Sequence, residues 1–356
     1  MIEWLTRTGT RLLHRASKTH PLGAARRLAR AGRHRDAIEL LSRAYDTSGE
    51  PELVQELVRL RYQAAVRNPS TRDAGDWPPD VPDVFPDASG LPEVAGREVT
   101  PEKLAAGIRH PGGPIVRGLF SAAEVELLAS CVRNAFAAMR RHRDGTATRE
   151  DGKWLHLFRA PDRRGVLHGG RGFAEDGAGV LGADSPATVH EVLKLAEARG
   201  IIAAVESFLG ERPSVSVMKT TLRIVPPTTG SGWHQDGAFL GDYVRSVNMW
   251  IALSECGEDA PSLDIIPKRF DHIVETGTEG APFDWAVADS VAARVAREAG
   301  VEILHADFAP GDAIFFDHMN LHKTGVRPGM TRDRLAIEWW FFAPSRFPEN
   351  QFPLLA

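Results

Sequence analysis

The chain has few cysteines, few tyrosines and no long apolar segment. Only Cys131 and Cys256 occur among 356 residues, which excludes a disulfide framework and a Cys-x-x-Cys metal or redox motif. No stretch approaches the roughly 20 apolar residues that a membrane-spanning helix requires, and the N-terminus lacks the apolar core of a secretory signal. We therefore expect a protein of the reducing cytoplasm with no membrane partner.

Basic residues are concentrated near the N-terminus, although the net charge is -4. Residues 1–45 contain ten Lys and Arg against three acids. The arginines of this cluster include Arg7, Arg11, Arg15, Arg26, Arg27, Arg30, Arg33 and Arg35. Such a cluster is compatible with a nucleic-acid or membrane-surface patch, or with a transit peptide, but it lacks the aromatic series of single-strand binders. We favour a solvated helix face and expect no nucleic-acid partner.

Composition divides the chain into three predicted regions. Residues 1–68 have apolar side chains at helical spacing, and the run from Ala29 to Leu41 resembles a tetratricopeptide hairpin. One such hairpin cannot bury its own apolar face, so we expect it to pack on the rest of the chain or to mediate self-association. Residues 69–98 are rich in Pro, Asp and Gly, which is typical of a linker. Residues 99–356 form the main predicted domain.

Within the main region, helices are predicted first and strands follow. Beyond Pro213, short segments rich in β-branched or aromatic residues are bounded by Gly, Pro or Asp, the pattern of β-strands. They span 215–225, 246–253, 262–266, 305–308, 313–316 and 335–342, and one helix from about Trp285 to Ala299 interrupts them. This order predicts an α+β fold with a mainly β core, a double-stranded β-helix (jelly roll) with flanking helices and an N-terminal helical appendage.

The segment from Asp144 to Ser185 is too long and too rich in Gly for a plain connection. We predict that Asp144 to Gly179 forms part of a mobile lid. Its aromatic and basic residues are Trp154, Phe158, Arg159, Arg163, Arg164 and Arg171.

Two histidines and one aspartate have the spacing of a metal site. His234 and Asp236 follow a predicted strand and a Pro/Gly turn, where side chains at i and i+2 share a face. His322 follows the predicted strand 313–316. Two imidazoles and one carboxylate leave the opposite face of a divalent ion open, which is typical of non-haem Fe(II) oxygenases. Alternative ligands are His272, His305 and His318.

A positively charged partner for a cosubstrate is also expected. An Fe(II) with three protein ligands has three open positions, of which 2-oxoglutarate can fill two and O2 one. The far carboxylate of 2-oxoglutarate requires a planar, permanently charged group, which Arg supplies. Arg334, twelve residues after His322 on the next predicted strand, is the expected partner. Arg327 and Arg332 lie in the turn between them and are expected to be solvated.

Several short motifs together resemble the phytanoyl-CoA dioxygenase family of Fe(II)/2-oxoglutarate oxygenases. They are Trp-His-Gln-Asp-Gly at 233–237, Gly-Asp-Ala-Ile-Phe-Phe at 311–316, Leu-His-Lys-Thr-Gly at 321–325 and Arg-Leu-Ala-Ile at 334–337. Residues 115–121 and 217–222 are similar to strands of the same family, so the resemblance covers about Thr100 to Pro344.

The resemblance implies the roles of individual residues. Iron would be bound by His234, Asp236 and His322, and 2-oxoglutarate would form a salt bridge with Arg334. Further cosubstrate contacts are implied for Gln235, Thr324, Trp250 and Thr221. The implied reaction converts 2-oxoglutarate and O2 to succinate and CO2 while hydroxylating an unactivated C–H bond of a small molecule of acyl or natural-product type. Asp236 argues against a halogenase, in which a small residue there opens a halide site.

Two other function classes stay open at this point. A cupin-like metal-binding jelly roll, such as an isomerase or a sugar-binding module, would not need Arg334, and Arg334→Ala would leave its activity intact. An interaction protein would depend on the N-terminal helices. Deleting residues 1–68 would distinguish an interaction protein from an enzyme, because an enzyme should retain turnover if the truncated protein folds.

Overall fold

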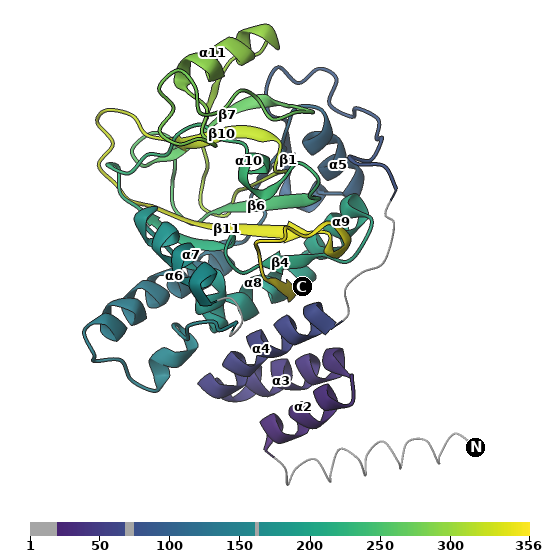
Figure 1. Cartoon of the computed structure of the whole chain (residues 1–356), viewed down its shortest axis with the longest axis vertical. Helices are drawn as coiled ribbons and strands as arrows, with labels where there is room; N and C mark the ends of the chain where they lie inside the picture. The colour runs from purple at the N-terminus through teal and green to yellow at the C-terminus, as the bar shows by residue number, and fades with distance from the viewer. Residues whose placement is uncertain (1–19, 68–74, 161–163) are drawn as a thin grey trace.

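The computed structural model describes residues 20–67, 75–160 and 164–356 (Figure 1). The helices are α2 (Pro21–Arg30), α3 (His34–Ser48), α4 (Pro51–Arg67), α5 (Pro101–Arg109), α6 (Ala122–Arg143), α7 (Arg164–Asp176), α8 (Pro186–Ala198), α9 (Ile201–Leu209), α10 (Gly237–Leu240) and α11 (Asp289–Glu298). The strands are β1 (Glu93–Ala95), β2 (Ile115–Arg117), β3 (Gly179–Leu181), β4 (Ser214–Ser216), β5 (Thr221–Val225), β6 (Ser246–Ala252), β7 (Ser262–Arg269), β8 (Leu304–Ala306), β9 (Ala313–Phe316), β10 (Asn320–Gly325), β11 (Arg334–Phe342) and β12 (Pro353–Leu355).

The strands form two sheets that face one another. The larger has the order β1-β2-β9-β6-β11-β4-β12, and β5 with β3 extends it beside the first half of β11. The smaller has the order β10-β7-β8 and lies above β6 and β11 in Figure 1. Two facing sheets with helices on the outer side are the predicted double-stranded β-helix with flanking helices, so the predicted fold class is confirmed.

Strand periodicity gives the two faces of the larger sheet different neighbours. On β6, Val247, Met249 and Ile251 belong to the core beneath the helices, whereas Trp250 and Ala252 face the smaller sheet. The same alternation on β11 separates Ile337, Trp339 and Phe341 from Ala336, Trp340 and Phe342. Successive side chains of a strand point to opposite faces, so Trp250 and Ala252 of β6 face the space between the two sheets together with Trp340 of β11.

Helices cover both outer surfaces of the two-sheet core. Residues of α5, α6, α8 and α9 pack on the larger sheet, and α11 packs on the smaller one through Val291 and Ala292 against Ile266 and Leu321. Helix α6 begins at Ala122, where Ser121 and Glu124 form a capping box. Among the described helices, none has the length and apolarity that crossing a membrane requires.

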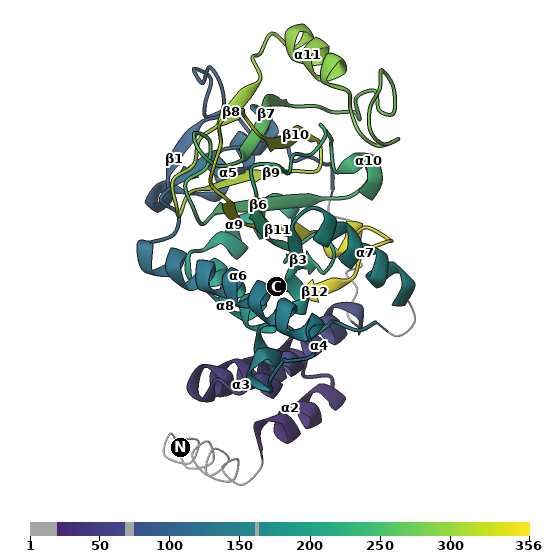
Figure 2. The same ribbon diagram turned by 90° about the vertical axis from the view of Figure 1, so that its left-hand side faces the viewer.

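The N-terminal helices pack on the rest of the chain. Helices α3 and α4 lie beside α8, and α4 also lies beside β12 (Figures 1 and 2). Their apolar cluster includes Leu53 and Leu60 of α4 and Ala187 of α8, and Arg61 donates a hydrogen bond of 2.7 Å to the carbonyl of Leu355. The hairpin therefore packs on the rest of the chain, which is the first of the two predicted alternatives. Self-association, the second, stays a prediction. Arg7, Arg11 and Arg15 lie outside the described residues.

The packing of α4 predicts a large effect of Leu60→Ala on stability. Leu60 has no exposed surface, and truncating a buried leucine removes its contacts and leaves a cavity, so the free energy of unfolding should fall by about 2–5 kcal/mol. Urea denaturation monitored by circular dichroism measures it. Leu127→Ala, at a position of α6 that is 40% exposed, is the control, with an expected change within about 0.5 kcal/mol. Equal changes in the two variants would contradict the prediction.

Four segments differ from the predicted pattern. The predicted linker contains β1, which pairs in parallel with β2. Residues 320–325, where no strand was predicted, form β10, because backbone pairing with β7 does not depend on apolar side chains. Helix α7 lies within the Gly-rich segment 144–179, and the helix expected from Trp285 begins at Asp289.

Both cysteines are free and buried, in agreement with the absence of a disulfide framework. Burial raises the pKa of Cys131 to about 12 and that of Cys256 to about 11. Neither thiol is therefore ionised at neutral pH, which excludes both as thiolate nucleophiles.

Candidate active site

The structure brings His234, Asp236 and His322 together between the two sheets. One ligand atom from each lies within 4.8 Å of the others. The two histidines are 88 residues apart in the chain, but their backbones form a bridge: each N–H donates to the carbonyl of the other, at 3.0 and 3.1 Å. The edge of β10 and the loop before α10 therefore hold the three side chains at one place.

Each imidazole is oriented through its Nδ1 atom. Nδ1 of His234 donates to the carbonyl of Gly232 at 2.9 Å, and Nδ1 of His322 donates to that of Asn320 at 3.2 Å. A carbonyl only accepts, so the proton resides on Nδ1 and Nε2 keeps a free lone pair. Backbone partners of this kind fix the tautomer that a metal-binding histidine needs.

Asp236 is buried at the start of α10, with 1% of its surface exposed. Its Oδ2 lies 3.8 Å from Nε2 of His322, and the Lys219 ammonium lies 2.5 Å from its Oδ1. The following residue, Gly237, allows the loop to approach its neighbours closely, because a Cβ there would lie 2.9 Å from Ile273. A larger residue at this position would force the side chains of Ile273, His318 or Met319 to shift.

Electrostatics keep Asp236 and His322 in their metal-binding protonation states. Burial alone would raise the pKa of Asp236, but Lys219, His234 and His322 outweigh burial and lower the pKa to about 2. Burial, with a smaller contribution from His234, lowers the pKa of His322 to about 4. At neutral pH the site therefore presents an anionic carboxylate and a neutral His322 imidazole, the forms that bind cations.

The low pKa of His322 predicts a pH-dependent loss of stability. In the unfolded chain this group has the ordinary pKa of 6.5, against about 4 when folded. As the pH falls from 6.5 to 4, the unfolded state binds a proton that the folded state excludes, so stability that is fully present above pH 6.5 is lost across this window, by about 3 kcal/mol. Urea denaturation of the metal-free protein between pH 7 and 4.5 measures it. His322→Gln should lose less stability over this range; parallel curves would contradict the prediction.

A cavity of about 430 Å³ opens onto these three side chains. Strands β6 and β11 line its inner wall with Asn248, Trp250, Arg334, Glu338 and Trp340. Its outer wall is aromatic and consists of Phe173, Phe239, Phe283 and Trp285. The volume lies in the range of small-molecule sites, and a few polar groups among apolar walls are typical of them.

Arg334 lies in the same cavity as a buried cation. It is 1% exposed, its Nη1 donates to the carbonyl of Ser262 at 2.9 Å, and its guanidinium lies 5.5 Å from the ring centre of Trp250. Within residues 20–67, 75–160 and 164–356 no carboxylate forms an ion pair with it, and its Nε has no partner. Burial lowers the pKa of Arg334 to about 10, so it stays charged and available to an external carboxylate.

These features agree with the comparisons with known proteins. The family model for phytanoyl-CoA dioxygenase matches residues 109–327. The chain belongs to the phytanoyl-CoA dioxygenase family. It is therefore a 2-oxoglutarate-dependent dioxygenase with Fe(II), 2-oxoglutarate and O2 as cofactor and cosubstrates, which excludes the cupin-like alternative without oxygenase activity. A search of curated proteins finds no match.

Solved structures were compared as well. EctD from S. alaskensis with 2-oxoglutarate and 5-hydroxyectoine is 18% identical, with 78% of this chain and 86% of that chain covered and a TM-score of 0.49. AviO1 from Streptomyces viridochromogenes Tue57 is 16% identical, with 68% and 94% covered and a TM-score of 0.42. The non-heme alpha ketoglutarate dependent carbocyclase SnoK from nogalamycin biosynthesis is 14% identical, with 71% and 87% covered and a TM-score of 0.44.

The donor set of this family member suits a divalent ion and a dianion. Among the described residues, Lys219 is the only side chain that approaches the Asp236 carboxylate as a donor within hydrogen-bonding distance. Two Nε2 lone pairs face the same space, and the unpaired Arg334 lines the same cavity. Buried polar groups in this state require external partners, and an iron ion with 2-oxoglutarate supplies both.

Of the four other residues predicted to contact the cosubstrate, two line the cavity and two do not. Thr324 and Trp250 line it, but Gln235 and Thr221 do not. The amide of Gln235 is fully buried, donates to the carbonyls of Met319 and His272 and accepts from the N–H of Val274. The hydroxyl of Thr221 donates to Glu338 at 2.7 Å. In this structure both side chains bond to the walls behind the cavity, and cosubstrate contacts from Gln235 and Thr221 stay predictions.

The alternative histidine ligands lie elsewhere. His318 is buried and bonds through Nδ1 to Ser246 at 3.0 Å. His305 bonds to Asp264 at 2.6 Å, and His272 is an exposed residue beside Asp271. None of the three lines the cavity. Arg327, expected to be solvated, is exposed and also forms an ion pair with Asp264 at 2.8 Å.

Of the described part of the predicted lid, only the C-terminal end reaches the cavity. Phe173, Asp176 and Gly177 line it, whereas Phe158 is buried in the helix-covered core and Trp154 packs on the N-terminal helices. Arg171 forms an ion pair with Asp184 at 2.6 Å, and Arg163 lies outside the described residues. A mobile lid therefore stays a prediction for the C-terminal part of α7.

Sequence reasoning missed Lys219, Arg223 and the aromatic wall. Thr221 and Arg223 lie two residues apart on β5, so strand periodicity could have placed Arg223 on the face of Thr221. Lys219 lies in the turn before β5, where strand periodicity gives no signal. Arg223 forms an ion pair with Glu338 at 3.1 Å. No comparable signal existed for Phe283 and Trp285, because they belong to a loop whose path depends on α11.

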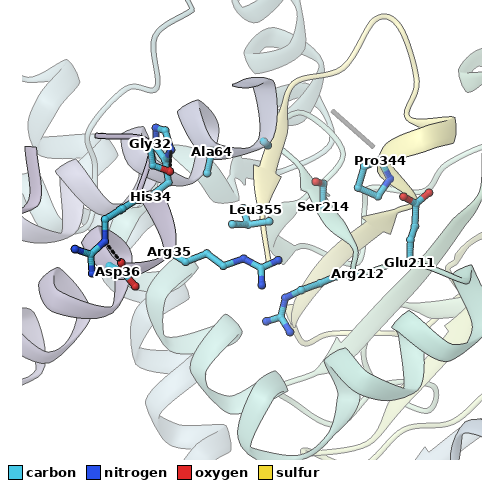
Figure 3. Close-up of a pocket in the computed structure, with 12 residues that line it drawn as sticks. Gly32, His34, Arg35, Asp36, Ala64, Glu211, Arg212, Ser214, Pro344 and Leu355 are labelled. Atoms are coloured by element: carbon cyan, nitrogen blue, oxygen red, sulfur yellow. Dashed lines mark hydrogen bonds and ion pairs between the residues drawn. The ribbon is translucent and has the colours of Figure 1, made fainter. Parts of the chain in front are cut away.

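Another cavity lies between the N-terminal helices and the oxygenase part (Figure 3). It has about 470 Å³ and contains Arg35 and Arg212, whose side chains extend toward one another. It includes none of the three converging ligands, so we do not assign the reaction to it. A second group of potential ligands, Asp46, His190 and Glu191, is already neutralised: Asp46 contacts His190 and Lys194 at 2.9 Å each.

Proposed function

We propose that this dioxygenase hydroxylates an unactivated C–H bond of a small molecule while 2-oxoglutarate is converted to succinate and CO2. His234, Asp236 and His322 bind the Fe(II), and Arg334 binds the far carboxylate of 2-oxoglutarate. The observation that supports this proposal most is the convergence of two Nε2 lone pairs and one carboxylate in the same cavity as a buried, unpaired guanidinium. The iron and its cosubstrate, when bound, supply the activation of O2.

The residues of the chain position the reactants and exclude water. The carbonyls of Gly232 and Asn320 orient the imidazoles, and Trp250 stacks behind Arg334. Phe239 and Trp285, with ring centres 5.3 Å apart, close one side of the cavity. A dry site of fixed geometry limits side reactions of the activated oxygen.

Anaerobic titration of the full chain with Fe(II) and 2-oxoglutarate tests the proposal. The weak visible charge-transfer band of an iron-bound 2-oxo acid should develop and saturate at one equivalent. Succinate in place of 2-oxoglutarate is the control, because it lacks the keto oxygen and should give no band. A protein that binds Fe(II) but never develops the band would contradict the proposal.

The type of oxidation has its own test. With a substrate in hand, hydroxylation under ¹⁸O2 should raise the product mass by one labelled oxygen atom, whereas desaturation would remove two hydrogens. Product analysis by mass spectrometry therefore decides between hydroxylation and its alternatives.

We further propose the division into a helical unit, a linker and an oxygenase domain, with β1 assigned to the last. The interface of α4 with α8 and β12 supports a stabilising role for the helical unit. Deletion of residues 1–68 would uncover Ala187 and part of Leu355, so the truncated protein should be less stable. A truncated protein with an unchanged melting temperature would contradict this role.

A further inference from the structure

Lys219 places a positive charge directly beside a proposed iron ligand. It lies in the turn between β4 and β5, and its side chain is 18% exposed. Its ammonium lies 2.5 Å from Oδ1 of Asp236, 4.8 Å from the ring centre of Phe239 and 5.3 Å from that of Trp340. It also lines the cavity.

The charges around the cavity do not balance without a further anion. Arg223 and Glu338 neutralise one another, and Asp176 is exposed at the rim, where water screens its charge. Among the residues that the structure describes, the inner cavity then has two cations, Lys219 and Arg334, and one anion, Asp236. A divalent metal and the dianion of 2-oxoglutarate cancel one another, so one positive charge remains in a site of low dielectric, where an unpaired charge is costly.

We propose that Lys219 is a specificity-determining residue that binds a substrate with one negative charge, a carboxylate. This inference rests on the proposed function, because Asp236 is shared between lysine and metal only in the iron-loaded enzyme. A lysine ammonium is a compact charge on a flexible stem, so it can turn from Asp236 to a substrate oxygen. A single anionic group completes the neutralisation, whereas a doubly charged phosphate exceeds it.

The aromatic wall indicates an apolar body for the same substrate. The rings of Phe283 and Trp285 are stacked with an angle of 8° and centres 5.0 Å apart. Phe173 and Phe283 at the mouth are 61% and 56% exposed, and exposed aromatic side chains around a cavity are typical of binding surfaces for apolar groups. The substrate class is therefore an amphiphilic acid whose charged end, and with it the oxidised carbon, lies toward Asp236.

A purely structural role for Lys219 makes a different prediction. If the lysine only positions the Asp236 carboxylate, Lys219→Gln should weaken metal binding. If it binds a substrate anion, the same variant removes a cation that repels the metal, so metal affinity should stay equal or rise. Titration with Mn(II), followed by electron paramagnetic resonance, measures this without turnover.

Ligand binding to the full chain, loaded with Mn(II) and 2-oxoglutarate under anaerobic conditions, tests the carboxylate preference. The probes are octanoate against octanamide and 3-phenylpropanoate against 3-phenylpropanamide, with the shift in melting temperature as readout. To give the same shift in melting temperature, the amides should require concentrations at least about 10-fold higher than the acids, since one charge-assisted hydrogen bond contributes about 1.5–3 kcal/mol. Lys219→Gln should abolish the difference and Lys219→Arg should retain it.

Lys268→Gln is the matched control, because Lys268 is exposed on β7 and does not line the cavity. It should behave like the wild type. Equal binding of acids and amides to the wild type, an acid preference that persists in Lys219→Gln, or weaker Mn(II) binding by that variant with unchanged acid binding would overturn the inference. Failure of the proposed function would instead appear as the absence of the Fe(II)/2-oxoglutarate band in the wild type.

Discussion

Asp236→Asn is expected to reduce succinate formation by at least roughly 10³-fold and metal affinity by more than about 100-fold. Loss of a group that merely orients a metal ligand typically costs 10–100-fold in affinity, and this substitution changes the ligand itself. The amide is neutral, while Lys219 at 2.5 Å keeps its charge and repels the metal. Equilibrium dialysis with Mn(II) and a coupled succinate assay measure the two quantities.

Asp271→Asn is the matched control for this prediction. The side chain of Asp271 is 91% exposed and pairs with His272, so its substitution should leave metal affinity and succinate formation unchanged. If Asp236→Asn retained more than a tenth of the wild-type metal affinity while folding normally, the assignment of Asp236 as a ligand would be wrong.

The parts of the site that could be predicted are those with strong local patterns. The spacing of His234 and Asp236 sets both in one loop, and the alternation along β6 and β11 decides that Trp250 and Arg334 face the cavity. In a strand the side-chain period is two, so one correctly oriented residue determines the others. The same rule explains why the two-sheet core was predicted from residue types alone.

Gln235 and His322 show where local patterns fail. Gln235 lies between two ligands in sequence, but its loop turns its amide toward the backbone of Met319 and Val274. His322 lies on a strand of mostly polar residues that is held by pairing with β7. Both positions depend on contacts with segments distant in sequence, which no periodicity records.

The position of Lys219 could not be predicted from the sequence for a different reason, the geometry of a turn. Its position beside Asp236 results from the turn between β4 and β5, where Ser216 accepts from the N–H of Lys219 at 3.1 Å. The residue type indicates a surface charge, since lysines are mostly exposed. Only the tertiary structure reveals that this charge faces a proposed metal ligand, and the substrate preference follows from that contact.

Arg334→Met is expected to raise the concentration of 2-oxoglutarate required for half-maximal activity by on the order of 10²-fold. Methionine fills much of the same volume but removes the charge, and hydrogen bonds to a charged group contribute about 1.5–3 kcal/mol each. Arg334→Lys should give a smaller increase, because a lysine retains the charge without the bidentate geometry. The exposed Arg332 in the adjacent turn provides the control, and Arg332→Met should leave this concentration unchanged.

The same variant separates binding from folding. Because no carboxylate among the described residues pairs with Arg334, its burial is unfavourable in the absence of 2-oxoglutarate, and an apolar replacement for a buried charge is often neutral or stabilising. The metal-free, cosubstrate-free Arg334→Met protein should therefore melt at the wild-type temperature or above it. Adding 2-oxoglutarate with Mn(II) should raise the melting temperature of the wild type far more than that of the variant, because only a ligand that binds the folded state stabilises it. A variant that melts lower without ligand, yet gains as much from 2-oxoglutarate as the wild type, would show that Arg334 supports the fold and that the cosubstrate binds elsewhere.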